Sequence, residues 1–164
     1  MFDFLKKKAK NTPVTLEAIA KGELVPLETV SDPVFSQKMM GDGYAIEPDD
    51  GAIYAPVTGT VTTVFPTQHA IGMESEEGLE ILLHLGFNTV DLDGKPFNSK
   101  VAAGDQVKAG QLLTQMDLEA VRQAGAETTC VLVLTQADQV ESLQLTDPKA
   151  VQAGDKVGQV TLKG

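Results

Sequence analysis

The chain has 164 residues and a mass of 17.4 kDa, a length that suits one domain with a well-buried core. Asp and Glu outnumber Lys and Arg by 23 to 13, and the resulting formal charge of −10 argues against a nucleic-acid-binding protein. No stretch approaches the roughly 18 consecutive apolar residues of a transmembrane helix. With one cysteine, Cys130, and no apolar leader, the sequence predicts a cytoplasmic protein.

The first ten residues, MFDFLKKKAK, are the one locally basic stretch and combine four lysines with three large apolar side chains. Such a segment can touch an anionic membrane surface weakly, but it is too short to bury much area. We therefore expect a flexible basic tail over residues 1–12 and a folded domain over residues 13–164. The lysine-rich start at Met1 favours a free-standing protein.

After the tail, short runs of β-forming residues alternate with turn pairs such as Asp50-Gly51 and Asp93-Gly94. Residues 59–65 (GTVTTVF) and 79–86 (LEILLHLG) have the β-branched or apolar character of central strands. This pattern predicts an all-β fold, either a sandwich or a barrel.

Helical spacing occurs in residues 117–124 (DLEAVRQA), with Asp117 as the expected N-cap and Gly125 as the expected C-cap. Leu118 and Val121 would share the buried face of this segment. Helix is therefore expected only as short turns.

The sequence contains two pairs of similar segments, or echoes. Residues 101–113 (VAAGDQVKAGQLL) resemble residues 151–160 (VQAGDKVGQV), and residues 22–30 more weakly resemble residues 59–67. Gly-Asp turns recur in β proteins through turn chemistry alone, but a match of both turn and strand favours an internal duplication. We expect two similar β halves packed together.

The chain has two histidines, and His84 lies within the apolar run ILLHLG. Because side chains alternate along a strand, His84 shares one face with Leu82 and Gly86, and the opposite face is apolar core. Gly86 would leave space beside the ring for the oxygens of an anionic ligand.

His69, in FPTQHAIGME, begins another run and is expected on a neighbouring strand, close enough for both imidazoles to share one ligand. Two chemistries fit such a pair: zinc coordination, or phosphoryl transfer with one ring as nucleophile. A neutral imidazole offers its lone pair without a separate base. Taken singly, each histidine also fits a hydrogen-bonded, half-buried structural role.

Four segments occur in an order and at a spacing that match one protein family. They are residues 32–46 (DPVFSQKMMGDGYAI), 55–74 (APVTGTVTTVFPTQHAIGME), 79–97 (LEILLHLGFNTVDLDGKPF) and 103–113 (AGDQVKAGQLL). The stretch H-x-G-x-x-T-V beginning at His84 is the most specific of these matches. Residues 13–164 thus resemble the IIA component of the glucose class in the bacterial phosphoenolpyruvate-dependent sugar phosphotransferase system.

The resemblance implies an antiparallel β-sandwich or flattened barrel built from a duplicated β motif. It implies that His84 is the phosphorylated residue, that His69 is the accessory histidine and that Thr67 orients His69 by a hydrogen bond. It also implies that the phosphoryl group comes from the histidine-containing phosphocarrier HPr and goes to a cysteine on the IIB domain of a sugar permease. No cofactor is required for this transfer.

The resemblance further implies an apolar docking face around the two rings, flanked by Asp32 and by Asn88, where some members of the family have aspartate. Its expected residues are Val34, Phe35, Met39, Met40, Phe65, Leu82 and Val90. Methionines suit a surface that accepts differently shaped partners.

Two alternatives accompany this interpretation. The unphosphorylated face around His84 could bind and inhibit metabolic proteins, with zinc shared between His69, His84 and a partner's ligand. A zinc hydrolase on a related scaffold is disfavoured, because the sequence has no H-x-H pair or third local ligand.

Overall fold

The computed structural model describes residues 13–164. The predicted basic tail over residues 1–12, with its expected weak membrane contact, lies outside the described residues. No helix within residues 13–164 is long and apolar enough to cross a membrane.

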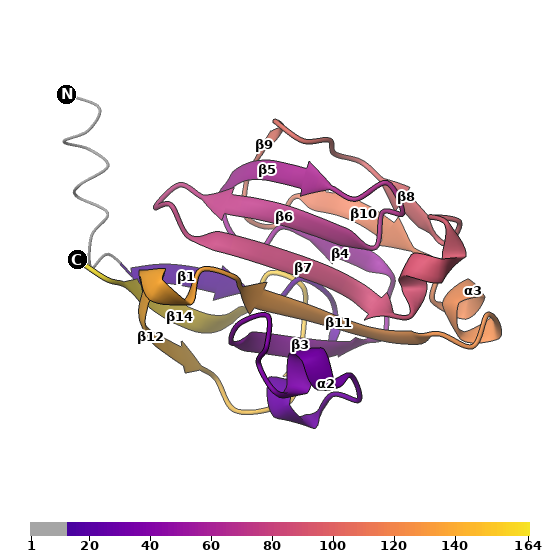
Figure 1. Ribbon diagram of the computed structural model, residues 1–164, viewed down its shortest axis with the longest axis horizontal. Coiled ribbons are helices and arrows are strands. Elements are labelled where there is room, and N and C mark those ends of the chain that lie inside the picture. Colours follow the sequence, from indigo (N-terminus) through magenta and orange to yellow (C-terminus); the bar gives the residue numbers. More distant parts are fainter. Residues whose placement is uncertain (1–12) are drawn as a thin grey trace.

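Strands dominate the described chain (Figure 1). The strands are β1 (Pro13–Glu17), β2 (Gly22–Pro26), β3 (Gly43–Pro48), β4 (Ala52–Tyr54), β5 (Gly59–Val64), β6 (Ala70–Ser75), β7 (Glu80–Phe87), β8 (Phe97–Ser99), β9 (Gln106–Val107), β10 (Leu112–Met116), β11 (Glu127–Leu134), β12 (Val140–Leu145), β13 (Lys149–Val151) and β14 (Lys156–Leu162). Short helices join some of them: α2 (Pro33–Ser36), α3 (Leu118–Gln123) and the 3-10 turns η1 (Leu27–Thr29), η2 (Thr89–Leu92) and η3 (Ala137–Gln139).

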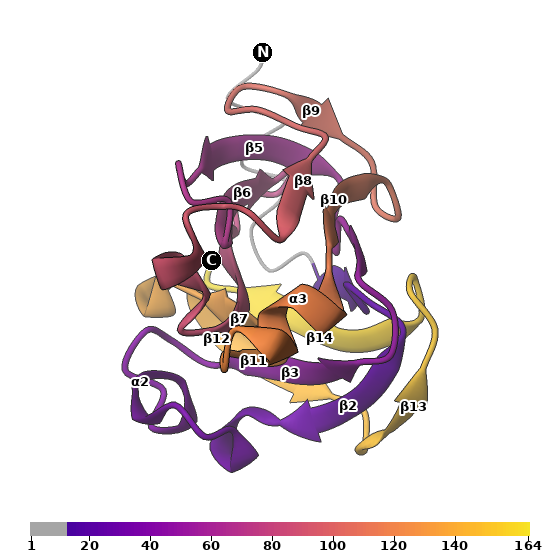
Figure 2. The same cartoon turned by 90° about the vertical axis from the view of Figure 1, so that its right-hand side faces the viewer.

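The strands form three sheets, and their pairings are antiparallel. The eight-stranded sheet has the order β13-β2-β3-β11-β7-β6-β5-β9, and the three-stranded sheets have the orders β1-β14-β12 and β4-β10-β8. In Figure 1, β5, β6, β7, β11 and β3 follow one another down the picture, and the end that carries α3 faces the viewer in Figure 2. The predicted all-β antiparallel sandwich is confirmed.

The main core consists mainly of the apolar side chains that alternate along the strands and face the interior. Along β7, Ile81, Leu83 and Leu85 are buried on the core face, as strand alternation predicted. They join apolar side chains from each of the three sheets in one cluster, among them Leu16, Ile53 and Val160. Burial of aliphatic residues on one face of each sheet therefore holds the layers together.

The stronger sequence echo corresponds to a repeated local structure. The N–H of Gly104 donates to the carbonyl of Val61, and the N–H of Val61 donates to the carbonyl of Asp105 at 2.8 Å. In the second copy, Gly154 and Asp155 make the same two bonds with Ala18. Gly110 and Gln111 also make these two bonds, with Ala55. Ala18 and Ala55 have the same sequence offset as Gly22 and Gly59, and these glycines pair with Val151 and Val107 at their two positions in the sheet. The structure therefore also supports the weaker echo, which aligned residues 22–30 with residues 59–67.

Two local expectations differ from the structure. The segment 59–65 was expected to be a central strand, but β5 lies next to the sheet edge and is covered there only by the two-residue β9. The second difference is α2, a helical turn that the sequence pattern did not indicate; Asp32 caps it by accepting a hydrogen bond from the Val34 N–H at 2.9 Å.

The helix expected over residues 117–124 is present as α3. The Asp117 carboxylate accepts from the Ala120 N–H, as its N-cap role predicted, and Val121 is buried. The helix ends at Gln123 and its C-cap is Ala124 rather than Gly125, which follows in a left-handed conformation with φ of +80°.

Candidate functional site

The fold brings the two histidines together. His84 lies on β7, and His69 immediately precedes β6, whose first residue, Ala70, is opposite His84 in the sheet. The His69 carbonyl accepts a hydrogen bond from the Leu85 N–H at 2.7 Å, which continues the pairing of the two strands. The ring centroids are 5.0 Å apart and the ring planes are inclined by 80°, so the edge of one ring meets the face of the other.

The His69 ring is held from its Nδ1 side. The Thr67 hydroxyl lies 2.6 Å from Nδ1, the contact that the sequence resemblance implied. Gln68, between them, has a left-handed backbone with φ of +59°, and its side-chain oxygen accepts from the Ser99 N–H at 2.9 Å. These two hydrogen bonds hold the turn and occupy Nδ1. Nε2 is therefore the His69 nitrogen that remains available to interact with a ligand.

The His84 ring packs against two phenylalanines. Its centroid lies 4.8 Å from that of Phe35 and 6.2 Å from that of Phe87. His84 Nδ1 is buried without a partner in full hydrogen-bonding geometry. Nε2 is neither among the buried unpaired atoms nor hydrogen-bonded within the described residues, so it is the nitrogen that faces solution.

Electrostatics keep this pair neutral at physiological pH. Burial, and secondarily the proximity of His69, lowers the pKa of His84 to about 4, although the Gly86 backbone and the Asp32 charge oppose the shift. Burial also lowers the pKa of His69. A neutral His84 exposes a lone pair on Nε2, so the site contains a nucleophile that needs no general base.

Gly86 does not serve the purpose predicted for it. It was expected to leave space for a ligand beside the ring, but it is buried, with φ of +80°. A Cβ atom at this position would lie 2.5 Å from Thr89 Cγ2 and 2.6 Å from the Glu127 carbonyl oxygen. Glycine is required because protein atoms fill that space, so an anion must approach His84 from the Nε2 side.

The expected docking face is largely exposed. Of the large apolar residues exposed within residues 13–164, only Leu145 was not expected to belong to it. Met39 is 70% exposed, whereas Leu82 is half-buried. The other exposed members are Val34, Met40, Phe65 and Val90. Of these, Phe65 lies against the His69 ring, with centroids 5.5 Å apart. Exposed apolar side chains of this kind are typical of a protein interaction surface.

Phe35 is the exception on this face. It was expected to contact partners, but it is only 4% exposed and belongs to a small apolar cluster on the outer side of the eight-stranded sheet. There it packs against the His84 ring and stacks on Phe87 at 5.6 Å. The α2 turn places it inward, so Phe35 supports the histidine instead of presenting a contact surface.

Of the two polar residues expected to flank the site, Asp32, the N-cap of α2, acts on the His84 ring through its charge. Asn88 is exposed and follows β7 in a left-handed conformation with φ of +64°. Sequence reasoning missed the bracing residue Gln68 and the ring-supporting residue Phe87, because neither a polar turn residue nor a strand-end phenylalanine has a local signature for such a role.

Metal ligands beyond the histidine pair are absent from the part of the chain that the structure describes, where no group of three or more His, Cys, Asp or Glu side chains is arranged to hold an ion. Two imidazoles fall short of the four ligands of a closed zinc site. Zinc would therefore need ligands from outside these residues.

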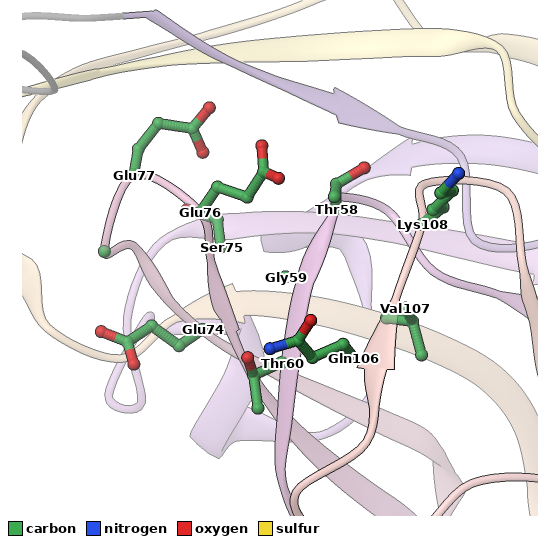
Figure 3. A pocket seen from close by; sticks show the side chains of 11 residues that line it. Thr58, Gly59, Thr60, Glu74, Ser75, Glu76, Glu77, Gln106, Val107 and Lys108 are labelled. Carbon is green, nitrogen blue, oxygen red and sulfur yellow. The ribbon is translucent and has the colours of Figure 1, made fainter. Parts of the chain in front are cut away.

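A surface hollow of about 660 Å³ lies away from the histidines (Figure 3). Its lining includes Gly59 and Ser75, at the ends of β5 and β6 opposite to those joined by the turn that carries His69. Glu76, Glu77 and Lys108 border it in Figure 3. The hollow is not part of the histidine site.

Comparison with known proteins decides the family. The family model described as "phosphoenolpyruvate-dependent sugar phosphotransferase system, EIIA 1" matches residues 14–140. This chain belongs to that family. The resemblance inferred from the sequence is thereby confirmed, and with it membership of a sugar phosphotransferase system.

Individual relatives agree. The chain is 50% identical over 145 residues to a glucose-specific EIICBA component of Streptococcus pneumoniae, covering 88% of this chain but only 20% of that protein. It is 42% identical over 157 residues to a glucose-specific EIIA component of Staphylococcus epidermidis, covering 94% of this chain and 95% of that protein. Among solved structures, glucose permease IIA from Mycoplasma capricolum matches with a TM-score of 0.82 and 35% identity, over 91% of this chain and 96% of that one.

Proposed function

We propose that this chain is a cytoplasmic phosphocarrier that accepts a phosphoryl group from phospho-HPr on His84 and passes it to a cysteine of a IIB domain. The observation that carries the proposal is the edge-to-face pair of neutral imidazoles, 5.0 Å apart, with the exposed ring of Phe65 against His69. Such a surface suits transient docking of protein partners. Its similarity to the glucose-specific components extends the proposal to glucose-class permeases.

The first transfer uses Nε2 of His84. Its lone pair attacks the phosphorus atom of phospho-HPr, a new N–P bond forms, and the N–P bond to the HPr imidazole breaks with its electron pair returning to HPr. His84 needs to lose no proton before the attack, because its lowered pKa keeps the ring neutral.

The second transfer returns His84 to its starting state. A IIB cysteine thiolate attacks the same phosphorus, an S–P bond forms, and the N–P bond to His84 breaks. Thr67 occupies Nδ1 of His69, so Nε2 is the nitrogen of this ring that remains for the transfer. We assign His69 to stabilising the phosphoryl oxygens during transfer, as a positioned hydrogen-bond donor or charge.

Labelling from phosphoenolpyruvate tests the proposal directly. Purified protein is incubated with labelled phosphoenolpyruvate, the general first enzyme of the system and HPr, and acid-labile label is measured. We expect one phosphoryl group per chain on the wild type, none on His84→Gln, and normal label on His69→Gln as the matched control. Label on His84→Gln would overturn the assignment of the nucleophile.

No cofactor is needed for these steps. Zinc binding at an interface is a further proposal: His69 and His84 would supply two ligands and a partner the others, which is testable by zinc titration with and without that partner. The regulatory role, in which the unphosphorylated face inhibits metabolic proteins, stays a prediction that requires a binding assay with each target.

A further inference from the structure

Thr89 is a buried polar residue that the transfer chemistry does not use. It is fully buried at the start of η2, and its hydroxyl donates a hydrogen bond to the Leu85 carbonyl at 2.7 Å. Its Cγ2 methyl packs on the Cα side of Gly86, where an added Cβ would lie 2.5 Å away. Thr89 therefore holds the Leu85–Gly86 peptide by a hydrogen bond to its carbonyl, and it holds the Gly86 Cα by an apolar contact.

The peptide at Gly86 lacks the support that a regular strand would give it. The register of β7 with β11 shifts at this point, because Phe87 pairs with Glu127 but Leu85 pairs with Cys130. Gly86 also has φ of +80°, a left-handed conformation outside the strand geometry. Contacts other than the sheet must therefore fix the orientation of this peptide.

That orientation matters because the Gly86 backbone acts on the His84 ring. It is an acceptor toward that ring, and it also contacts the buried Cys130 thiol. The contact with His84 is short of full hydrogen-bonding geometry, since Nδ1 has no partner within those limits. It is still the polar group that acts on the buried side of the ring, and an acceptor there favours the tautomer with the proton on Nδ1.

We propose that Thr89 is a positioning residue: it fixes the Leu85–Gly86 peptide and thereby the adjoining Gly86 carbonyl, so that His84 keeps its proton on Nδ1 and presents the lone pair of Nε2 to the phosphoryl donor. The inference rests on the proposed function of His84 but concerns a different residue. Thr89 touches neither the phosphoryl group nor the ring in this role; it acts through Gly86.

Thr89→Val separates the hydroxyl from the packing, because valine keeps the shape and loses the donor. We expect the ¹⁵N chemical shifts of the two His84 ring nitrogens to move toward each other in the unphosphorylated protein, which reports a mixed tautomer population. We expect phosphorylation by HPr to slow about tenfold. Thr89→Ser, which retains the hydroxyl, should keep wild-type ring shifts and a rate within about twofold of wild type.

Thr114→Val is the matched control. Thr114 is also fully buried, but its hydroxyl has no partner, and it lies on β10 in a different sheet. The same substitution there should leave ring shifts and rate unchanged. If Thr89→Val does not fold, Thr89→Ala serves instead, because it removes the hydroxyl and adds no methyl group in its place. It should shift the ring signals in the same direction.

The proposal is overturned if a folded Thr89→Val or Thr89→Ala variant has wild-type ring shifts, or if Thr89→Ser is as slow as Thr89→Val. Failure of the proposed function would look different. Wild-type protein would then take no label on His84, while the ring shifts of the unphosphorylated variants would still report on Thr89.

Discussion

The ring of His69 lies edge-on to the ring of His84, at 80° and with centroids 5.0 Å apart. The two rings are held by different means. Thr67 binds His69 through a hydrogen bond at 2.6 Å, whereas His84 packs against the stacked rings of Phe35 and Phe87 with its Nδ1 buried. This asymmetry gives the rings separate tasks, with the less accessible nitrogen fixed in each case and Nε2 left to react.

His69→Gln should affect the two phosphoryl transfers differently. Acceptance from HPr should continue, because the nucleophilic nitrogen is on His84, but delivery to IIB should fall about 10²-fold because a positioned charge-stabilising group is lost. Rapid-quench measurement of each half-reaction checks this. Equal delivery rates for variant and wild type would remove His69 from the mechanism.

Thr67→Val should weaken delivery by a smaller factor. Without the hydroxyl, His69 loses a bond that contributes about 1 kcal/mol, and its ring becomes free to turn, so delivery should slow roughly fivefold. Thr63→Val, on the exposed side of β5, is the control and should be neutral. If both variants deliver at the wild-type rate, the Thr67 bond has no functional role.

The sequence anticipated the features that depend on pattern. Alternation placed Ile81, Leu83 and Leu85 in the core, and the two sequence echoes predicted the duplication that the repeated backbone hydrogen bonds show. It did not anticipate features that depend on long-range packing.

Gly86 illustrates that limit. Its missing Cβ is explained by Thr89 and by Glu127, which is 41 residues away in the chain (127 − 86), and no local pattern reports that contact. Phe35 was misplaced for a related reason. A capped helical turn rotates it inward, and a four-residue helix is too short to show periodicity.

Acid should destabilise the protein through His84. Its pKa is about 4 in the folded chain against 6.5 for an unperturbed ring, so the unfolded chain binds the proton more readily between these values. Stability is therefore full above pH 6.5 and falls as the pH decreases toward 4, by about 3 kcal/mol in total. Urea unfolding at several pH values measures this loss.

His84→Gln should lose less stability over the same pH range, because glutamine does not titrate. The pKa of His69 is lowered too and contributes in the same direction, so some dependence should persist in this variant. Parallel curves for His84→Gln and wild type would contradict a neutral, buried His84.

Truncation of Phe35 should lower the stability of the protein, whereas truncation of Met39 should weaken its binding to HPr. Phe35→Ala removes a buried ring from the small cluster and should cost about 3–5 kcal/mol of unfolding free energy. Met39→Ala, at a side chain 70% exposed, should change stability by less than about 0.5 kcal/mol but weaken HPr binding by about 1 kcal/mol. Calorimetry on both variants provides the comparison, and unaltered HPr affinity for Met39→Ala would argue against its place in the docking face.

Asn88→Asp should accelerate encounter with HPr. Asn88 is exposed and directly follows β7, the strand that carries His84, and the resemblance implies that a carboxylate there pairs with a basic HPr side chain. Added negative charge at the docking face steers a basic partner, so the association rate should rise a few fold at low salt. The gain should disappear near 0.5 M salt, where the Debye length shrinks to roughly 4 Å. Stopped-flow association measures this rate.

Gln144→Glu makes the same charge change at an exposed position on β12, in another sheet, and should have little effect. An equal gain from both substitutions would mean that total charge, and not the position of Asn88, sets the encounter rate.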